Sequence, residues 1–282
     1  MNKLSFVASM LMMCFSMTMM AQKNGAKALD KPDPNFQIYL CFGQSNMEGN
    51  AAIEDIDRTG VNPRFMAMYA VDDEKAGWKK GQWHTAVPPQ ARPSTGLTPV
   101  DYFGRKMVDN LPDSIKVGTI TVAVGGASID LFDKRTCKAY LKKQPDWMKN
   151  FASQYHGNPY ARLIELGKIA KKQGVIKGIL LHQGETNNGD ANWPNRVKTV
   201  YYDILKDLNL KAEDVPLLVG ETVQKDQGGS CWQHIAVVDD IAKTIPTAHV
   251  ISSKGCPQRG DGLHFIAESY RTMGKRYANM ML

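Results

Sequence analysis

Three side chains at two distant places in the chain could together activate a hydroxyl group. Ser45 lies in the stretch FGQSNMEG, directly after the apolar run 37–41, and Asp261 and His264 lie close together in DGLHF. An aspartate can accept the imidazole Nδ1–H and leave Nε2 free to take a proton from a serine hydroxyl, which would make Ser45 a nucleophile. Turn formation by Ser45 and helix capping by Asp261 explain the same residues when each is taken alone.

Two more stretches carry groups that could stabilise negative charge on an oxygen. The run VAVGGASI ends in Gly125-Gly126, where glycine lets the backbone approach a substrate and donate an N–H. The stretch LLHQGET places Gln183 at the end of another apolar run, where its side-chain amide could also donate. Taken singly, a tight turn and a routine polar residue at a strand end explain these features as well.

Short apolar runs alternate with helical patterns along the chain, which predicts an α/β fold. Nearly continuous runs of Val, Ile and Leu are typical of parallel strands buried on both faces. Because parallel strands bring their carboxyl ends together, Ser45, Gly126, Gln183 and His264 are expected to converge, and this convergence favours a chemical role. The predicted strands are 37–41, 115–124, 175–183, 215–220 and 248–253, with a further short strand at 64–71, and the predicted helices are 99–111, 159–174, 195–210, 232–245 and 264–282.

The first 21 residues are typical of a secretory signal peptide. Lys3 precedes an apolar stretch over residues 4–20, and Ala21 could precede the cleavage site. An uncleaved membrane anchor is the alternative, since the stretch is nearly long enough to span a bilayer. We therefore expect a signal peptide over 1–21, a surface lead-in over 22–35, a single domain over 36–282, and a mature protein that is exported to the periplasm or secreted.

The composition argues against several classes of function. The chain has 35 Lys and Arg against 28 Asp and Glu, a formal net charge of +7, but its basic residues are scattered and no stripe interleaves them with aromatic side chains. We expect no nucleic-acid partner and no stable membrane insertion after cleavage, and the oligomeric state stays open. Zinc-binding spacings, Walker patterns and GxGxxG patterns accompanied by a helix are absent, so no metal and no cofactor are expected.

Four cysteines lie beyond the predicted signal peptide: Cys41, Cys137, Cys231 and Cys256. An exported protein can form disulfides, and the sequence allows three full pairings of four cysteines. Cys41 lies in the first predicted strand and is expected to act as a small buried hydrophobe. If any pair forms, we expect it to join Cys231 to Cys256.

The stretches GQSNMEG, GGASI, HQGET and DGLHF resemble the four signature blocks of the SGNH hydrolase superfamily. They are most similar to its carbohydrate acetylesterase branch, which holds acetylxylan esterases of carbohydrate esterase family 6 and sialate O-acetylesterases. The blocks extend from about residue 37 to 268, nearly the whole predicted domain. The resemblance implies a flavodoxin-like three-layer α/β/α sandwich with a parallel sheet of about five strands.

The resemblance also implies catalytic roles. It implies Ser45 as the nucleophile, His264 as the base and Asp261 as the acid that orients the imidazole. It further implies an oxyanion hole formed by the N–H groups of Ser45 and Gly126 and by the side chain of Gln183. The wider superfamily has Asn where this chain has Gln183, which leaves the third donor less certain.

Three neighbouring polar residues belong to the same motifs. Gln44, Asn46 and Glu185 are interpreted as groups that organise the loops around the site. Glu185 could instead compete with Asp261 as the orienting acid. Tryptophans in or beside predicted loops, at Trp78, Trp83 and Trp193, could stack on a sugar ring or pack as core.

The function implied is that of an exported serine esterase that removes O-acetyl groups from carbohydrate, such as acetylxylan or a related plant polysaccharide, through an acetyl-enzyme. A sialate O-acetylesterase is the first alternative. A carboxylate-binding arginine in the pocket would favour it, and Arg92, Arg135 and Arg259 are candidates. A carbohydrate-binding protein without activity is the alternative from another class. A lipase or phospholipase of the same superfamily is a further possibility.

Overall fold

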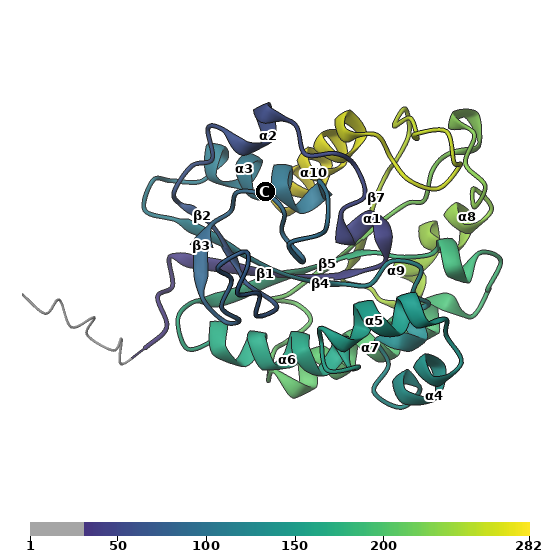
Figure 1. Ribbon diagram of the computed structural model, residues 1–282, viewed down its shortest axis with the longest axis horizontal. Helices are drawn as coiled ribbons and strands as arrows, with labels where there is room; N and C mark the ends of the chain where they lie inside the picture. The colour runs from purple at the N-terminus through teal and green to yellow at the C-terminus, as the bar shows by residue number, and fades with distance from the viewer. Residues whose placement is uncertain (1–30) are drawn as a thin grey trace, which may run out of the picture. The chain divides into compact units, whose positions relative to one another are not determined.

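A seven-stranded sheet forms the centre of the computed structural model, which describes residues 31–282 (Figure 1). The strands are β1 (Phe36–Gly43), β2 (Phe65–Met68), β3 (Trp83–Thr85), β4 (Lys116–Ala123), β5 (Val175–His182), β6 (Leu217–Gly220) and β7 (Ala248–Ile251). They lie in the order β3-β2-β4-β1-β5-β6-β7, and every neighbouring pair is parallel except β2 with β3. The predicted signal peptide lies outside the described residues.

The five predicted main strands form the parallel core of this sheet. In the order β4-β1-β5-β6-β7 they have the arrangement of a flavodoxin-like doubly wound fold, so the predicted fold class is confirmed. The sheet has seven strands rather than about five, because β2 and β3 extend it at one edge. The short strand predicted at 64–71 is β2, whereas β3 has only three residues, too few for a period to be recognised.

Helices cover both faces of the sheet and make the three layers predicted (Figure 1). Side chains alternate along β1, so Leu40 and Phe42 join one buried cluster while Tyr39 and Cys41 join the other. Helices α6 and α7 complete the first cluster, and α3 and α10 complete the second. The helices are α1 (Ser45–Glu48), α2 (Asp55–Arg58), α3 (Pro99–Asn110), α4 (Cys137–Lys142), α5 (Asp146–Ser153), α6 (Pro159–Ala170), α7 (Trp193–Asp207), α8 (His234–Asp239), α9 (Ile241–Thr244) and α10 (Ala267–Met281), with 3₁₀ turns at Ile129–Leu131, Glu185–Asn187 and Lys225–Gln227.

Most predicted helices are present within a few residues of their predicted ends. The helix predicted over 232–245 is instead two short helices, α8 and α9, which meet at Asp240. Helices α4 and α5 are absent from the sequence prediction, because both are short and Pro145 interrupts the segment between them. Helix α5 nevertheless has an apolar stripe that includes Trp147, Met148 and Phe151. These two helices matter below, because α5 contributes to the candidate site.

Helices α3 and α10 cross at very short range. A Cβ atom at Gly274 of α10 would overlap the carbonyl oxygen of Pro99 and lie 2.9 Å from the Phe103 nitrogen, both in α3. Glycine therefore permits the backbones to approach. This contact lies in the middle of α10 and holds the helix against α3, and the loop that precedes α10 carries His264.

All four cysteines of the described part of the chain are buried free thiols. The expected pairing of Cys231 with Cys256 is therefore wrong. The Sγ of Cys231 lies 3.5 Å from the carbonyl oxygen of Glu185, while the Sγ of Cys256 lies 3.5 Å from Nη1 of Arg276. Each thiol thus occupies its own packing site, as Cys41 does in the sheet.

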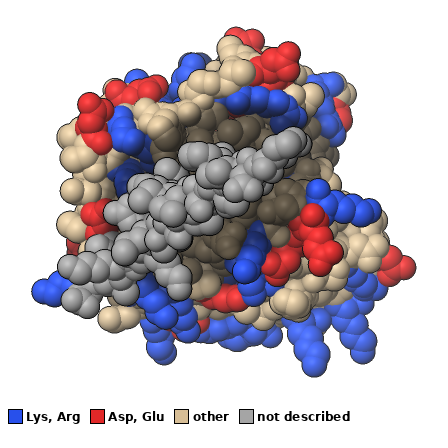
Figure 2. All heavy atoms as spheres, turned by 60° about the vertical axis from the view of Figure 1, so that its left-hand side comes forward, with Lys and Arg blue, Asp and Glu red and all other residues tan. Residues whose placement is uncertain are grey.

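Charges of both signs are interspersed on the face shown in Figure 2, where basic and acidic side chains alternate around the rim and several basic ones follow the lower edge. This distribution agrees with the scattered basic residues of the sequence. Over residues 31–282, no helix combines the length and apolar character needed to cross a membrane. In the same range, no group of three or more His, Cys, Asp or Glu side chains could hold a metal ion.

Candidate active site

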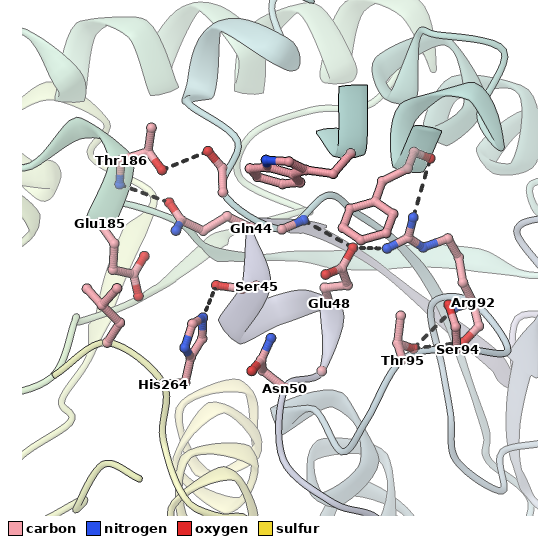
Figure 3. A pocket seen from close by; sticks show the side chains of 16 residues that line it. Gln44, Ser45, Glu48, Asn50, Arg92, Ser94, Thr95, Glu185, Thr186 and His264 are labelled. Atoms are coloured by element: carbon pink, nitrogen blue, oxygen red, sulfur yellow. Dashed lines mark hydrogen bonds and ion pairs between the residues drawn. The ribbon is translucent and has the colours of Figure 1, made fainter. Parts of the chain in front are cut away.

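A cavity of about 470 Å³ lies at the carboxyl end of the parallel strands (Figure 3). Ser45 follows β1, Gly126 follows β4, Glu185 follows β5, and His264 reaches the cavity from the loop between β7 and α10. Strand β1 lies between β4 and β5, where the connections of a doubly wound sheet diverge, and such sheets bind ligands at this point. The topology thus brings together the residues that the sequence singled out.

Ser45, His264 and Asp261 form a continuous chain of hydrogen bonds. The Ser45 Oγ lies 2.9 Å from the His264 Nε2, and the His264 Nδ1 lies 2.7 Å from the Asp261 Oδ2. The other carboxylate oxygen of Asp261 accepts the N–H groups of Leu263 at 2.9 Å and His264 at 2.8 Å, which fixes the turn between acid and base. The arrangement suits transfer of the Ser45 proton to the imidazole.

The carboxylate of Asp261 is held in its charged form. Partial burial raises its pKa, but hydrogen bonds from the backbone and imidazole of His264, from the Leu263 N–H and from Arg259 outweigh this and hold the pKa well below its usual value. The Arg259 Nε lies 2.8 Å from the Asp261 Oδ2, and its Nη1 donates to the Asn50 carbonyl at 2.9 Å. Asp261 therefore stays ionised at any pH near neutrality.

Asn46 ties the nucleophile's helix to the loop that carries the base. Its Nδ2 donates to the Leu263 carbonyl at 2.9 Å and to the Glu185 Oε1 at 2.5 Å. Its Oδ1 accepts the Tyr270 hydroxyl at 2.6 Å and lies 3.4 Å from the Phe265 nitrogen. Asn46 therefore holds the surrounding loops together, which is the part that the sequence interpretation gives it.

Glu185 does not compete for the imidazole. Its Oε1 binds Asn46, whereas the His264 Nδ1 binds Asp261. Burial raises the pKa of Glu185, and a backbone hydrogen bond and Asn46 only partly offset this. The geometry therefore assigns the orienting position to Asp261 and leaves Glu185 as a support for the Asn46 contact.

Two backbone N–H groups face the cavity without an acceptor. Over residues 31–282, neither the Ser45 nor the Gly126 nitrogen donates to another protein atom. Gly126 has a φ of 69°, and a Cβ there would lie 2.7 Å from the Trp147 ring, so glycine is required. The Gly125 N–H is different, because it donates to the Glu48 Oε1 at 3.1 Å. Both residues line the cavity with an unused N–H, and their role as oxyanion donors stays a prediction.

The structure does not place Gln183 where the predicted oxyanion role requires it. Its side chain is fully buried and lies behind the cavity. Its Nε2 lies 2.7 Å from the Asn187 Oδ1, 3.1 Å from the Gln44 Oε1 and 3.2 Å from the Ala127 carbonyl oxygen, while its Oε1 accepts the Trp193 Nε1–H at 2.5 Å. The amide is committed to protein partners and has no N–H left for a substrate oxygen.

The Gln44 side chain also lines the cavity, and its amide nitrogen has no partner among residues 31–282. Its Oε1 lies 3.1 Å from the Gln183 Nε2, 3.4 Å from the Gly184 nitrogen and 3.3 Å from the Thr186 nitrogen. The Gln44 amide nitrogen must therefore point away from these donors, and Figure 3 shows it on the side of Ser45. Gln183 thus acts on the cavity by orienting Gln44.

A buried ion pair, which the sequence analysis missed, lines the same cavity. Arg92 donates through Nη2 to the Glu48 Oε1, and its guanidinium lies 4.5 Å from the centre of the Phe151 ring. Burial raises the pKa of Glu48, while Arg92 and the Gly125 N–H oppose this. The spacing of Glu48 from Ser45 was the available signal, because residues three apart on a helix share a face.

Trp147 of α5 is the tryptophan that borders the cavity, and its side chain is 48% exposed. The candidates from the sequence lie elsewhere. Trp193 is fully buried, and Trp78 and Trp83 pack against the core at the β3 side of the sheet. Trp147 could not be recognised because α5 itself was not predicted.

Several solved structures share this fold. A protein from Arabidopsis thaliana is 19% identical, with a TM-score of 0.65 over 88% of this chain and 98% of its own. NanS is 15% identical, with a TM-score of 0.63 over 89% of this chain and 97% of its own. A carbohydrate acetylesterase from Xanthomonas citri is 16% identical, with a TM-score of 0.57 over 86% of this chain and 55% of its own.

At these identities the structural likeness establishes the fold, and the sequence match establishes the family. The family model described as "carbohydrate esterase, sialic acid-specific acetylesterase" matches residues 35–282, which include all the blocks that meet at the cavity. The resemblance to carbohydrate acetylesterases is thereby confirmed. The four blocks fold around one cavity, and the family model matches the chain from residue 35 to residue 282. The chain therefore belongs to the carbohydrate esterase, sialic acid-specific acetylesterase family.

Proposed function

We propose that the protein is a serine esterase that removes O-acetyl groups from neutral carbohydrate, such as acetylated xylan, through an acetyl-enzyme. The observation that carries the proposal is the hydrogen-bonded chain from Ser45 through His264 to Asp261, which opens into a cavity beside two unpaired N–H groups. Side chains already in contact argue against a binding protein that has lost its chemistry.

In the first half of the reaction, the Ser45 Oγ attacks the ester carbonyl while the His264 Nε2 takes its proton. The negative charge that forms on the carbonyl oxygen is stabilised by the N–H groups of Ser45 and Gly126, and we assign the third donor to the Gln44 side chain. The imidazolium, paired with Asp261, then protonates the sugar oxygen as it leaves, and an acetyl-serine remains.

In the second half, water replaces the sugar alcohol. His264 takes a proton from the water, whose oxygen attacks the acetyl carbonyl, and the same donors stabilise the second tetrahedral intermediate. Collapse of that intermediate breaks the bond to the Ser45 Oγ, which regains its proton from His264. Acetate leaves, and the site returns to its starting state.

The placement of three arginines supports a neutral sugar over a sialic acid. Arg92 lines the cavity but is 1% exposed and paired with Glu48. Arg135 lies away from the cavity, where it pairs with acidic side chains, and Arg259 is bound to Asp261. Arg92 and Arg135 are thus unsuited to a substrate carboxylate, and Arg259, although 46% exposed, already binds Asp261.

Sialate O-acetylesterase activity is the second candidate, and the description of the matched family favours it. It requires a cation at the cavity, and Arg259, which is partly exposed beside Asp261 and His264, is the candidate. A direct comparison of the two substrates separates the candidates.

We further propose that the mature protein is exported. The charged start and apolar stretch of residues 1–21 support this, and so does a polymeric substrate, which an enzyme must meet outside the cell. Fractionation of cells that express the full chain, with mass measurement of the mature N-terminus, tests this proposal.

The test of the activity is acetate release from acetylated xylan and from O-acetylated sialic acid, measured for the wild type and for Ser45→Ala. Release from xylan that is lost in the variant is the expected result. Release from sialic acid alone would favour the second candidate. Faster hydrolysis of octanoyl than of acetyl esters would indicate a lipase, and no release from any ester by folded protein would overturn the proposed activity.

A further inference from the structure

Glu48 presents an unpaired carboxylate oxygen to the cavity. Its Oε1 is occupied by Arg92 and by the Gly125 N–H, whereas its Oε2 has no hydrogen-bond partner among the described residues. The residue is 5% exposed, and it borders the cavity (Figure 3). A bound ligand that displaced water from this oxygen would have to supply a hydrogen-bond donor, because an unpaired buried acceptor is costly.

The free oxygen of Glu48 is close to the nucleophile. A Cβ atom placed on the Gly125 backbone would lie 2.8 Å from the Glu48 Oε2 and 3.9 Å from the Ser45 Cβ. Arg92 and the Gly125 N–H both hold the carboxylate, so its position is set before substrate binds. A donor that reaches Oε2 while an ester carbonyl sits at Ser45 would therefore lie near the acylated carbon of the sugar.

An exposed aromatic surface lies next to the same point. The Trp147 ring lies beside Gly126, since a Cβ at that glycine would be 2.7 Å from it. It packs edge-on to Phe151 at 5.8 Å between ring centroids and leaves nearly half of its side chain accessible. An exposed indole beside a small polar cavity offers an apolar face to a flat ligand with polar edges.

We propose that Glu48 and Trp147 form a subsite for the sugar ring, in which the Glu48 Oε2 accepts a free hydroxyl next to the acetylated one and Trp147 packs against the ring's apolar face. The inference rests on the proposed function and names its substrate more narrowly. The preferred substrate is a neutral pyranose that carries one acetyl group with a free neighbouring hydroxyl. A sugar acetylated at both positions should bind slowly, or it should first lose the neighbouring acetyl group to another esterase.

The subsite makes a specific prediction about discrimination. A cavity built to accept a hydroxyl rejects an analogue without that donor much more strongly than an apolar cavity rejects a small change of shape. Replacement of the neighbouring hydroxyl by fluorine keeps the size of the ring substituent but removes the donor. The fluorinated substrate would leave Oε2 unpaired and place fluorine against a carboxylate.

The experiment compares two substrates, a monoacetylated methyl xyloside with a free neighbouring hydroxyl and its neighbouring-fluoro analogue. It is run at pH 8, well above the ordinary pKa of a glutamate, because burial raises the pKa of Glu48. For the wild type we expect kcat/KM to be at least about 30-fold higher for the hydroxyl substrate. In Glu48→Gln, the amide can keep its oxygen toward Arg92 and direct an N–H into the cavity. The variant no longer places a negative charge against fluorine or requires a donor from the substrate, so the preference should fall to about fivefold or less.

Trp147→Ala tests the other half of the subsite. It should raise KM for both sugars about tenfold and leave the ratio of their kcat/KM values unchanged. For phenyl acetate, which has no sugar ring, kcat/KM should fall by a smaller factor. The matched controls are Glu165→Gln, which alters a surface ion pair, and Trp232→Ala, which removes an exposed tryptophan that does not line the cavity. Both should behave as wild type.

The outcomes separate this inference from the proposed function. If the wild type releases acetate from both sugars at equal rates, or if Glu48→Gln slows both substrates in parallel, the subsite is wrong and the esterase stands. If the wild type releases acetate from neither sugar, the proposed function itself fails.

Discussion

The two oxygens of the Asp261 carboxylate have separate tasks. One accepts the imidazole of His264, and the other accepts two backbone N–H groups that hold the turn. The acid therefore fixes both the tautomer and the position of the base. Arg259 adds a charge-assisted contact to the oxygen that faces the imidazole, which keeps the carboxylate ionised.

Replacement of Asp261 by asparagine should therefore impair catalysis much more than folding. In Asp261→Asn, the amide can present an N–H to Nδ1 and stabilise the wrong tautomer, so we expect kcat on phenyl acetate to fall by about 10³-fold or more. Asp146→Asn is the control, since this carboxylate is exposed and its partner is Lys149. A fall of less than tenfold in Asp261→Asn would contradict the assigned role.

Gln44 and Gln183 should behave as one unit. Gln44→Ala removes the proposed third oxyanion donor and should lower kcat by about 10²-fold. Gln183→Met removes the group that orients Gln44 and should lower kcat as well, and the double variant should be no worse than Gln44→Ala. Kinetics on phenyl acetate with circular dichroism as a folding check would show this, and additive losses would argue for two independent roles.

The sequence could single out Ser45, Asp261 and His264, because their motifs resemble a known family and parallel strands should bring them together. The spacing of Asp261 and His264 alone also fits a helix cap. It could not choose between the two glutamines. Gln44 and Gln183 both follow strands, and the choice depends on which amide finds acceptors inside the protein. That depends on Asn187 and Trp193, which lie on later turns and contact Gln183 only in the folded chain.

At the scale of elements, α10 is held closely against α3. The two helices cross at Gly274, and the loop before α10 carries His264. The five main strands and these helices were predictable, because apolar residues that repeat along a segment indicate which of its faces is buried. Strand β3 and helices α4 and α5 were not, because they are short and gain their order from packing against the rest of the protein.

Gly274→Ala should destabilise the protein despite the higher helix propensity of alanine. The added methyl group meets backbone atoms of α3 that cannot move singly, so we expect a loss of about 1–3 kcal/mol in the free energy of unfolding. In the control, Gly167→Ala, the nearest atoms belong to the flexible Leu208 side chain, and the propensity gain of about 1 kcal/mol should offset the contact. Urea unfolding curves give both values, and equal effects would contradict the explanation.

For the whole molecule, buried histidines make stability depend on pH. His182 is fully buried in β5, and burial lowers its pKa to about 4, below the ordinary value of about 6.5. Between about pH 4 and 6.5, His182 is therefore protonated in the unfolded chain and neutral in the folded chain. The stabilisation is complete above the unfolded pKa and is lost as the pH falls from about 6.5 to 4.

We expect His182 alone to reduce the free energy of unfolding by about 2 kcal/mol between pH 7 and pH 4.5. Other groups titrate in the same window, so the measurement is a difference between two proteins. Urea unfolding of the wild type and of His182→Leu at both pH values should show a smaller decrease in the variant. Equal decreases would mean that His182 does not contribute.

The distance along the chain between Ser45 and its base is 219 residues. A ribosome makes the nucleophile first and the base near the end of the described domain, so a growing chain carries a serine that is chemically no different from any other. Hydrolysis can begin only when the loop before α10 has brought His264 to Ser45 at the end of β1. Recovery of activity after dilution from denaturant should therefore mark the last step of folding, and an active-site titrant would count completed molecules.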